Sequence, residues 1–325
     1  MKTATTILSF FFCLIILSSL FAVNAQTFTE ITLTSHQQSY NRGDIVTVSG
    51  ELLSAEQAIN GLVGLTVVNA KGSTILLRTV TAGTISNPLG AITSAYLSDL
   101  SAYELTSTVA GELAYFTISV INTDYMPRDL CAIISVYDNN GVPLSYAATK
   151  FPAVPSGKGF TTTMSVDIPY EAAGGSAFAY GGLYSNLPNQ GGYPLAPEVS
   201  IPFTLIGTTQ GANQPSTSNG NQGLYELSFK LANRTPIGQH TVYAISRVNG
   251  VIASTLASFT VKQPGDFNGD GVLNIYDLVF FSNNWIAYYS GQPWNQLVDL
   301  NKDSKIDFLD LVIFSNAWIL YNSGV

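Results

Sequence analysis

The chain has 325 residues, of which 46% are hydrophobic and only 10% are charged, and its net charge at pH 7 is −8. This length suggests two or three domains, and the negative charge argues against electrostatic binding of nucleic acid. From Gly265 to the end there are seven Asp, no Glu and two Lys, so more than half of the excess negative charge lies in the last fifth of the chain. That concentration suggests a bound cation.

The N-terminus has the pattern of an export signal. Lys2 is followed by an apolar run from about Ile7 to Val23, and the segment ends in Val23-Asn24-Ala25. Small residues at these positions suit cleavage after Ala25, so we predict that residues 1–25 are a signal peptide and that the protein is secreted or held at the cell surface. An uncleaved signal anchor is the alternative, because the run is nearly long enough to span a bilayer. No second apolar run of that length follows, so we expect no stable membrane span after cleavage.

Removal of the signal leaves a single cysteine, Cys131, and one thiol cannot form an internal disulfide. Stability must then come from core packing, with bound metal as a further source. In the segment CAIISVYD the cysteine alternates with apolar neighbours. This pattern predicts a buried core thiol rather than a nucleophile.

Residues 26–262 consist of short alternating or apolar runs rich in Val, Ile, Thr, Tyr and Phe, separated by turn residues. Lys71-Gly72 and Asn140-Gly141 stand where hairpin turns need a positive φ. No stretch here keeps a helical period for three turns. The pattern predicts a mainly β protein, most simply one built from antiparallel β-sandwiches.

The β region is discontinuous. Residues 26–83 supply about four strands and residues 223–262 about three, and each piece alone is near the size at which a core becomes marginal. We therefore predict one seven-stranded sandwich from 26–83 plus 223–262, a second β-sandwich inserted over 84–205, and a flexible, polar linker over 206–222. Two sandwiches in tandem are the competing layout.

Two resemblances accompany this division. The join resembles a bacterial and archaeal immunoglobulin-like family related to macroglobulin domains, with Thr81 and Gly223-Leu224-Tyr225 on its two sides and Phe229, Gly238 and Val242 following in order. The segment GELAYFTISVINTDYMPRDLCAIISVYDNNGVPL is similar to cell-adhesion-related β-sandwich modules.

The stretch Tyr170–Pro194 is rich in Gly and Tyr. It could be a binding loop with aromatic contacts or a long surface excursion between strands, and the surface excursion is favoured.

Two twelve-residue segments, DFNGDGVLNIYD and DLNKDSKIDFLD, place oxygen-bearing residues at positions 1, 3, 5, 9 and 12 and a backbone carbonyl at position 7. This spacing can wrap Ca²⁺, a hard cation that takes six to eight oxygen ligands. Two matches in register predict two calcium ions and leave little room for a pair of ordinary Asp- and Asn-rich turns. The expected ligands of the first ion are Asp266, Asn268, Asp270, the Val272 carbonyl, Asn274 and Asp277. Those of the second are Asp299, Asn301, Asp303, the Lys305 carbonyl, Asp307 and Asp310.

The two segments differ at position 6, where the chain turns sharply and favours glycine. Gly271 supplies it in the first, whereas Ser304 in the second must adopt a positive φ at a cost of about 1 kcal/mol. Position 12 is Asp in both, shorter than the Glu of a standard EF-hand, so each loop must close more tightly or accept a weaker bidentate contact.

The flanks of these segments separate them from a standard EF-hand. Pro264 and Gly265 follow a strand end, so no helix can enter the first segment. After each segment a helix is predicted: Leu278, Phe281 and Trp285 share one helical face, and the second copy repeats this pattern. Residues 263–325 therefore form a small domain that we expect to need its metals for stability.

This arrangement resembles the dockerin family, specifically the type I pattern, over roughly 265–321. Dockerins are non-catalytic modules that bind cohesin modules, so the resemblance implies a cohesin-like protein partner. It places the partner-reading residues at loop positions 10 and 11, here Ile275-Tyr276 and Phe308-Leu309. Well-known bacterial dockerins have small hydroxyl residues there, so this chain departs from their pattern at the partner-reading positions. These apolar residues could bind a different cohesin, or pack against the connector or the neighbouring sandwich.

No active-site motif stands out. The only histidines are His36 and His240, no zinc spacing or nucleophile motif is present, and the carboxylates of the β region are scattered with no evident pair. The sequence thus predicts a non-catalytic exported protein that docks through a calcium-dependent, dockerin-like module. The alternatives are sandwiches that bind a polysaccharide or a cell surface and, less favoured, a polysaccharide hydrolase component.

Overall fold

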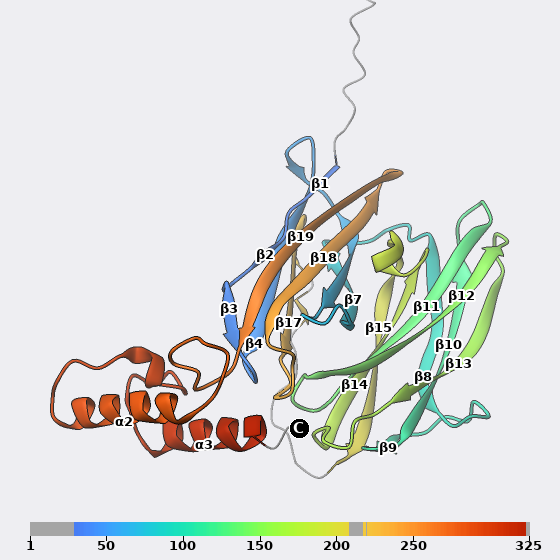
Figure 1. The fold of residues 1–325 in the computed structure, drawn as a ribbon. Helices are drawn as coiled ribbons and strands as arrows, with labels where there is room; N and C mark the ends of the chain where they lie inside the picture. The colour runs from blue at the N-terminus through green and yellow to red at the C-terminus, as the bar shows by residue number, and fades with distance from the viewer. Residues whose placement is uncertain (1–28, 208–216, 219, 323–325) are drawn as a thin grey trace, which may run out of the picture.

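The computed structural model describes residues 29–207, 217–218 and 220–322, which form a mainly β chain with two C-terminal helices (Figure 1). The expected signal peptide lies outside the described residues. No helix among the described residues is both long and apolar enough to cross a membrane. The predicted mainly β class is confirmed.

The first β unit, residues 29–82 and 217–262, consists of two facing sheets. Their strands come from both ends of the β region: β17 pairs with β4, and β18 pairs with β6. One sheet contains β1 (Thr29–Ile31), β2 (Thr34–Ser35), β4 (Ile45–Ser54), β5 (Gln57–Ala58), β16 (Thr217–Ser218) and β17 (Leu224–Lys230). The other has the order β3 (Ser39–Asn41), β19 (Val251–Lys262), β18 (Gly238–Val248), β6 (Gly61–Val68) and β7 (Thr74–Ala82).

The second β unit, residues 90–206, lies within the sequence of the first and also has two sheets. One has the order β13 (Gly159–Asp167), β10 (Leu113–Asn122) and β8 (Gly90–Ser98). The other has the order β12 (Pro143–Val154), β11 (Arg128–Tyr137), β14 (Gly175–Tyr184), β15 (Pro194–Ile206) and β9 (Ser107–Val109), with the 3-10 turn η1 (Pro188–Gln190) between β14 and β15.

Each β unit has its own hydrophobic core, because alternate strand residues point inward. In β4, for example, Val46, Val48 and Leu52 are buried in the core of the first unit. Phe116 and Ile134 are buried in the core of the second. The chain leaves and re-enters the first unit at neighbouring points, since Ala82 and Gly220 form an isolated β-bridge.

Two segments differ from the sequence-based expectation. The end of the expected linker is not featureless, because Thr217 and Ser218 pair with Leu227 and Glu226 and thereby cover the edge of β17. The Gly- and Tyr-rich stretch Tyr170–Pro194 is not mainly a surface excursion either. Its middle, Gly175–Tyr184, is β14, whose glycines permit close packing: a Cβ on Gly181 would lie 3.0 Å from Val199.

The helical region, residues 266–322, follows β19 without an entering helix. It comprises loop 1 (Asp266–Asp277), α2 (Ile275–Tyr289), the 3-10 turn η2 (Gln296–Val298), loop 2 (Asp299–Asp310) and α3 (Phe308–Asn322). Stacked aromatic rings join the two helices: the Phe314 centroid lies 5.8 Å from that of Phe267 and 5.5 Å from that of Phe281. The expected helical face is therefore the core of this region.

Candidate calcium loops and docking face

Loop 1 is organised by its first and last aspartates. Asp266 accepts hydrogen bonds from the backbone N–H groups of Gly269 and Gly271, both at 2.9 Å. Asp277, which is fully buried, accepts from the N–H groups of Phe267 and Asn274, also at 2.9 Å. These bonds join the two ends of the loop and fix its curvature.

Loop 2 repeats this network 33 residues later. Asp299 accepts from the Ser304 N–H at 2.8 Å, and the buried Asp310 accepts from Leu300 at 2.7 Å and Asp307 at 2.8 Å. Equivalent aspartates in the two loops thus make equivalent hydrogen bonds to the backbone.

The loops lead directly into their helices. Asn274 is the N-cap of α2, its side chain accepts from the Tyr276 N–H at 2.8 Å, and Asp277 completes a capping box. A carboxylate in the first turn also interacts favourably with the helix dipole. Positions 9 and 12 of loop 1 therefore start α2 as well as close the loop.

The backbone adopts a positive φ at positions 4 and 6 of both loops. Gly269 and Gly271 have φ of 74° and 80°, and Lys302 and Ser304 have φ of 61° and 67°. The expected left-handed conformation of Ser304 is confirmed, and Lys302 adds a second such residue that the spacing did not reveal.

The donor chemistry fits a hard cation, since every expected ligand in both loops offers oxygen. Within the described parts of the chain, however, no group of three or more His, Cys, Asp or Glu side chains is gathered in a way that could hold a metal ion. Several loop carboxylates bond backbone N–H groups instead. The ligand set thus fits calcium by type, while the carboxylates do not converge on one point.

The four candidate docking residues are all exposed. Ile275 and Tyr276 are 57% and 72% exposed, and Phe308 and Leu309 are 69% and 56% exposed. More than half of the surface of each of these side chains is therefore accessible to solvent. They form two equivalent apolar pairs at the starts of α2 and α3.

The helical region touches the first β unit beside loop 2. Lys302 Nζ lies 3.3 Å from Asp44 Oδ2. In the link between β19 and loop 1, Gln263 Oε1 accepts a hydrogen bond from Arg42 Nη1 at 2.9 Å. A cavity of about 200 Å³ separates Arg42 from Ile313 of α3. This contact is narrow and polar.

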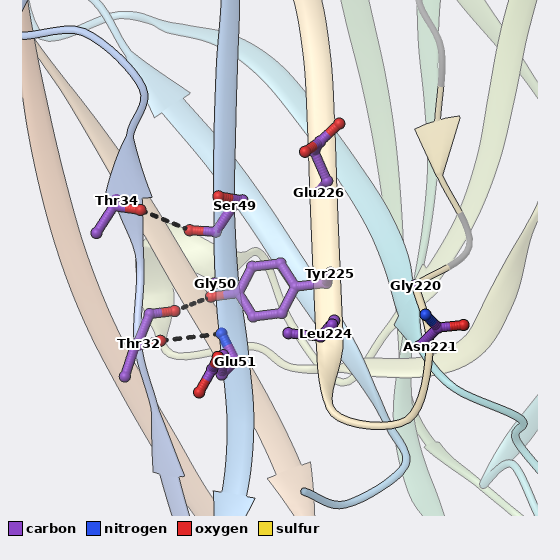
Figure 2. Close-up of a pocket in the computed structure, with 10 residues that line it drawn as sticks. All are labelled: Thr32, Thr34, Ser49, Gly50, Glu51, Gly220, Asn221, Leu224, Tyr225 and Glu226. Atoms are coloured by element: carbon purple, nitrogen blue, oxygen red, sulfur yellow. Dashed lines mark hydrogen bonds between the residues drawn. The ribbon is translucent and has the colours of Figure 1, made fainter.

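The sequence drew attention to Cys131 and to the scattered carboxylates. Cys131 is buried as predicted, and burial raises the pKa of its thiol to about 11, far from that of a nucleophile. Glu51 and Glu226 line one groove of about 550 Å³ on neighbouring strands (Figure 2). Their side chains point away from each other in that view, so the groove offers no facing pair of the glycosidase kind.

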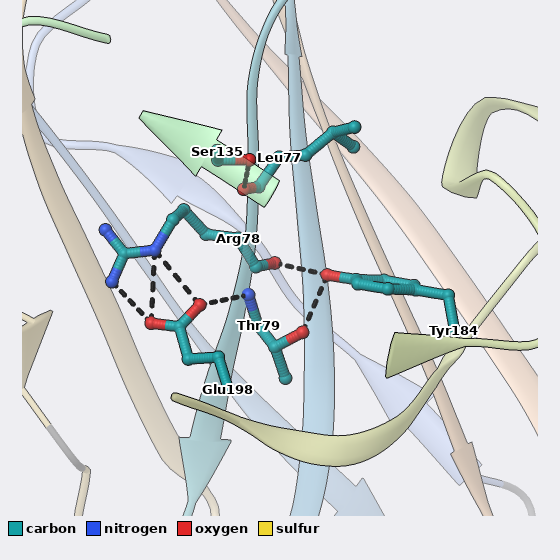
Figure 3. Close-up of polar contacts among 6 residues, drawn as sticks. All are labelled: Leu77, Arg78, Thr79, Ser135, Tyr184 and Glu198. Carbon is teal, nitrogen blue, oxygen red and sulfur yellow. Dashed lines mark hydrogen bonds and ion pairs between the residues drawn. The ribbon is translucent and has the colours of Figure 1, made fainter. Parts of the chain in front are cut away.

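A buried ionic cluster at the junction of the two β units was not anticipated. Arg78 of β7 is 1% exposed and pairs through two nitrogens with Glu198 of β15 (Figure 3). Its guanidinium carbon lies 3.3 Å from the centre of the Tyr180 ring. Burial lowers the pKa of Arg78, but the Glu198 carboxylate outweighs it, so the pKa lies above its ordinary value. The guanidinium therefore stays charged inside the protein.

The same cluster covers the open edge of β7. Glu198 accepts from the Thr79 N–H at 2.8 Å, and the Tyr184 hydroxyl donates to the Arg78 carbonyl at 2.7 Å. Ser135 Oγ donates to the Leu77 carbonyl at 2.7 Å. Side chains of the second unit thus satisfy backbone groups that an edge strand would otherwise leave unpaired.

Comparison with known proteins gives no family. No protein-family model and no curated protein matches the chain. Among solved structures, the C-terminal domain of wzt is 15% identical over 38% of this chain and 77% of its own, with a TM-score of 0.31. A CARDB domain from Pyrococcus furiosus in complex with di-metal ions is 10% identical over 38% of this chain and 99% of its own, with a TM-score of 0.25.

A β-glucuronidase from Bacteroides uniformis is 10% identical, with a TM-score of 0.28. The match covers 51% of this chain but only 27% of the glucuronidase. All three of these TM-scores are below 0.5, so the likeness is weak.

Proposed function

We propose that this is an exported, non-catalytic protein that docks, in a calcium-dependent way, onto a cohesin-like protein module. In this proposal residues 26–83 plus 223–262 are an immunoglobulin-like sandwich, residues 84–205 an inserted sandwich and residues 263–325 a dockerin-like module. The observation that carries the proposal is the repeated loop–helix unit. In each copy the first and last aspartates of the loop make equivalent hydrogen bonds, and an exposed apolar pair stands at the start of the helix.

Calcium would be held by the twelve ligands named from the sequence, six in each loop. Bound Ca²⁺ supplies positive charge that draws the loop oxygens together. The residues of the chain do the rest: Asp277 and Asp310 tie each loop to its helix, and the aromatic stack around Phe314 holds the helices together. Residues 275–276 and 308–309 would then be presented to the partner.

Calcium binding is tested by titration calorimetry on residues 26–325. We expect two ions for the unaltered protein and one for each of Asp277→Ala and Asp310→Ala. The matched control is Asp167→Ala at the exposed end of β13, which should still bind two. Absence of binding at millimolar calcium would remove the proposal.

Docking is tested separately, by capture of the same protein on immobilised cohesin modules with calcium and with EDTA. We expect capture with calcium only, and a loss of about tenfold or more in affinity for Tyr276→Asp or Phe308→Asp if that pair is buried on docking. Calcium binding without capture by any cohesin module would keep the metal site and reject the docking role.

A further inference from the structure

A cleft of about 670 Å³ lies where the two β units meet on the outer face of β18 and β19. One wall carries Tyr243 and Leu256, which are opposite each other in the β18–β19 register and are 41% and 60% exposed. The other wall includes Pro188 and Asn189 of η1 in the second unit. The volume is that of a small-molecule site, and the junction of two domains is a usual place for one.

Among the residues that the structure describes, no charged one lines this cleft. Tyr243 and Leu256 give it an apolar side, and the Thr74 and Ser254 hydroxyls and the Asn189 amide give it polar groups. These three polar side chains make no hydrogen bond to other described residues. The cleft therefore offers an aromatic surface beside several free hydrogen-bonding groups.

Both walls are held in place by the fold. Tyr243 stands on a central strand that pairs with β19 on one side and β6 on the other. The η1 turn is closed by bonds of 3.0 Å from Gly191 N to Pro188 O and from Gly192 N to Leu187 O, and a Cβ on Gly192 would lie 1.9 Å from the Asn186 carbonyl. An ordered site loses little entropy when a ligand binds.

Contacts across the junction fix the walls relative to each other. Thr79 Oγ1 donates to the Tyr184 hydroxyl at 2.7 Å, and the Arg247 guanidinium lies 5.4 Å from the Tyr193 ring. At Gly64 a Cβ would lie 2.9 Å from the Tyr184 ring, so the second unit packs directly on the outer face of β6. The cleft is therefore a fixed feature of the two-unit body.

The lining selects the chemistry of the ligand. A charged ligand would lose hydration without meeting an opposite charge. A wholly apolar ligand would leave the hydroxyls and the amide unpaired. We propose that the cleft binds a neutral oligosaccharide, whose C–H faces would cover Tyr243 and whose hydroxyls would meet Thr74, Ser254 and Asn189. This inference does not rest on calcium or on docking.

The test is titration calorimetry of residues 26–325 with cellohexaose, xylohexaose and mannohexaose, in EDTA so that the loops play no part. We expect one of these to bind, about tenfold weakening for Tyr243→Ala, and near-normal affinity for Tyr243→Phe, which keeps the ring. Tyr125→Ala is the matched control, because Tyr125 is 86% exposed in the turn between β10 and β11 and does not line the cleft. Far-UV circular dichroism checks that each variant is folded.

Three outcomes would overturn the proposal. They are the absence of binding by all three sugars at millimolar concentration, equal affinity of Tyr243→Ala and the unaltered protein, and tighter binding of a charged sugar such as hexagalacturonic acid.

Discussion

The chain has two junctions between folded parts, and they are built differently. Between the β units, Arg78 and Glu198 form an ion pair whose side chains are 0% and 15% exposed, surrounded by tyrosine rings. Between the first β unit and the helical region, the pair Lys302–Asp44 has side chains 59% and 27% exposed. The first junction is protein interior, and the second is a surface contact.

This difference indicates which parts should unfold together. Removal of one partner from a buried pair leaves an uncompensated charge, whereas an exposed pair contributes little. We therefore expect the two β units to unfold as one body and the helical region to respond on its own. All three tryptophans, 285, 294 and 318, lie in the helical region, so Trp fluorescence reports that region, whereas circular dichroism near 218 nm reports mainly the more numerous strand residues.

The largest effect is expected from Glu198→Gln, which keeps the volume but leaves Arg78 charged and unpaired. We expect the free energy of unfolding of the β body to fall by about 3–5 kcal/mol, measured by urea denaturation followed at 218 nm. Glu171→Gln is the control, since its pair with Arg234 is about half exposed, and it should cost about 1 kcal/mol or less.

A second comparison separates charge from packing at this junction. The double variant Arg78→Met, Glu198→Leu should recover much of the lost stability, because replacing a buried pair by apolar residues is often neutral. Equal losses for Glu198→Gln and Glu171→Gln would show that the junction is not held as an interior.

The next effect is a pH dependence confined to the β body. His240 is buried against Phe259, and burial lowers the pKa of its imidazole. Because the unfolded chain takes up this proton first, stability is complete above the unfolded-state pKa and falls as the pH drops through it toward the folded-state pKa. The slope is at most about 1.4 kcal/mol per pH unit.

Urea denaturation at several pH values below 7 measures this slope, which His240→Gln should remove. The Trp transition of the helical region should keep the same pH profile in both proteins. An unchanged slope at 218 nm in the variant would show that another group titrates there.

The helical region has its own probe at position 6 of the loops. Ser304→Gly relieves a positive φ of 67° and should stabilise this region by about 0.5–1 kcal/mol, after allowance for the greater freedom of glycine when unfolded. Gly271→Ser is the reverse change in loop 1 and should destabilise by a similar amount. Both are measured by Trp fluorescence, with no shift expected at 218 nm, and shifts of the same sign in the two variants would contradict this explanation.

Features that depend on local sequence pattern could be predicted, whereas the buried junction could not. Hydrophobic periodicity and turn residues identified the mainly β class, the helices after the loops and the buried Cys131, because these depend on local pattern. The spacing of oxygen-bearing residues located the loops, and the positive φ at Ser304 followed from its position. The calcium itself, the docking partner and the signal peptide stay predictions.

The buried junction was missed because its residues are far apart in sequence, at positions 78 and 198. Each was visible only as a single charge within an apolar run, LLRTV and APEVS, in a chain with few charges. A lone charge at a strand position whose neighbours are buried is a usable signal for a buried pair. Separation in sequence also hid the cleft beside Tyr243, whose walls come from β18, β19 and η1.

The smallest effect is expected at the exposed junction, from Lys302→Ala. Lysine and alanine both carry a Cβ, so the backbone strain from the positive φ at position 302 is the same in the variant. The change therefore removes only the ion pair with Asp44. We expect about 0–1 kcal/mol, decreasing as salt is added. Lys305→Ala is the control, because it removes the same charge from the same loop, and Lys305 forms no ion pair with the described residues. If Lys302→Ala lowered the free energy of unfolding by more than about 2 kcal/mol, both at 218 nm and by Trp fluorescence, the helical region and the β body would have to unfold as a single unit.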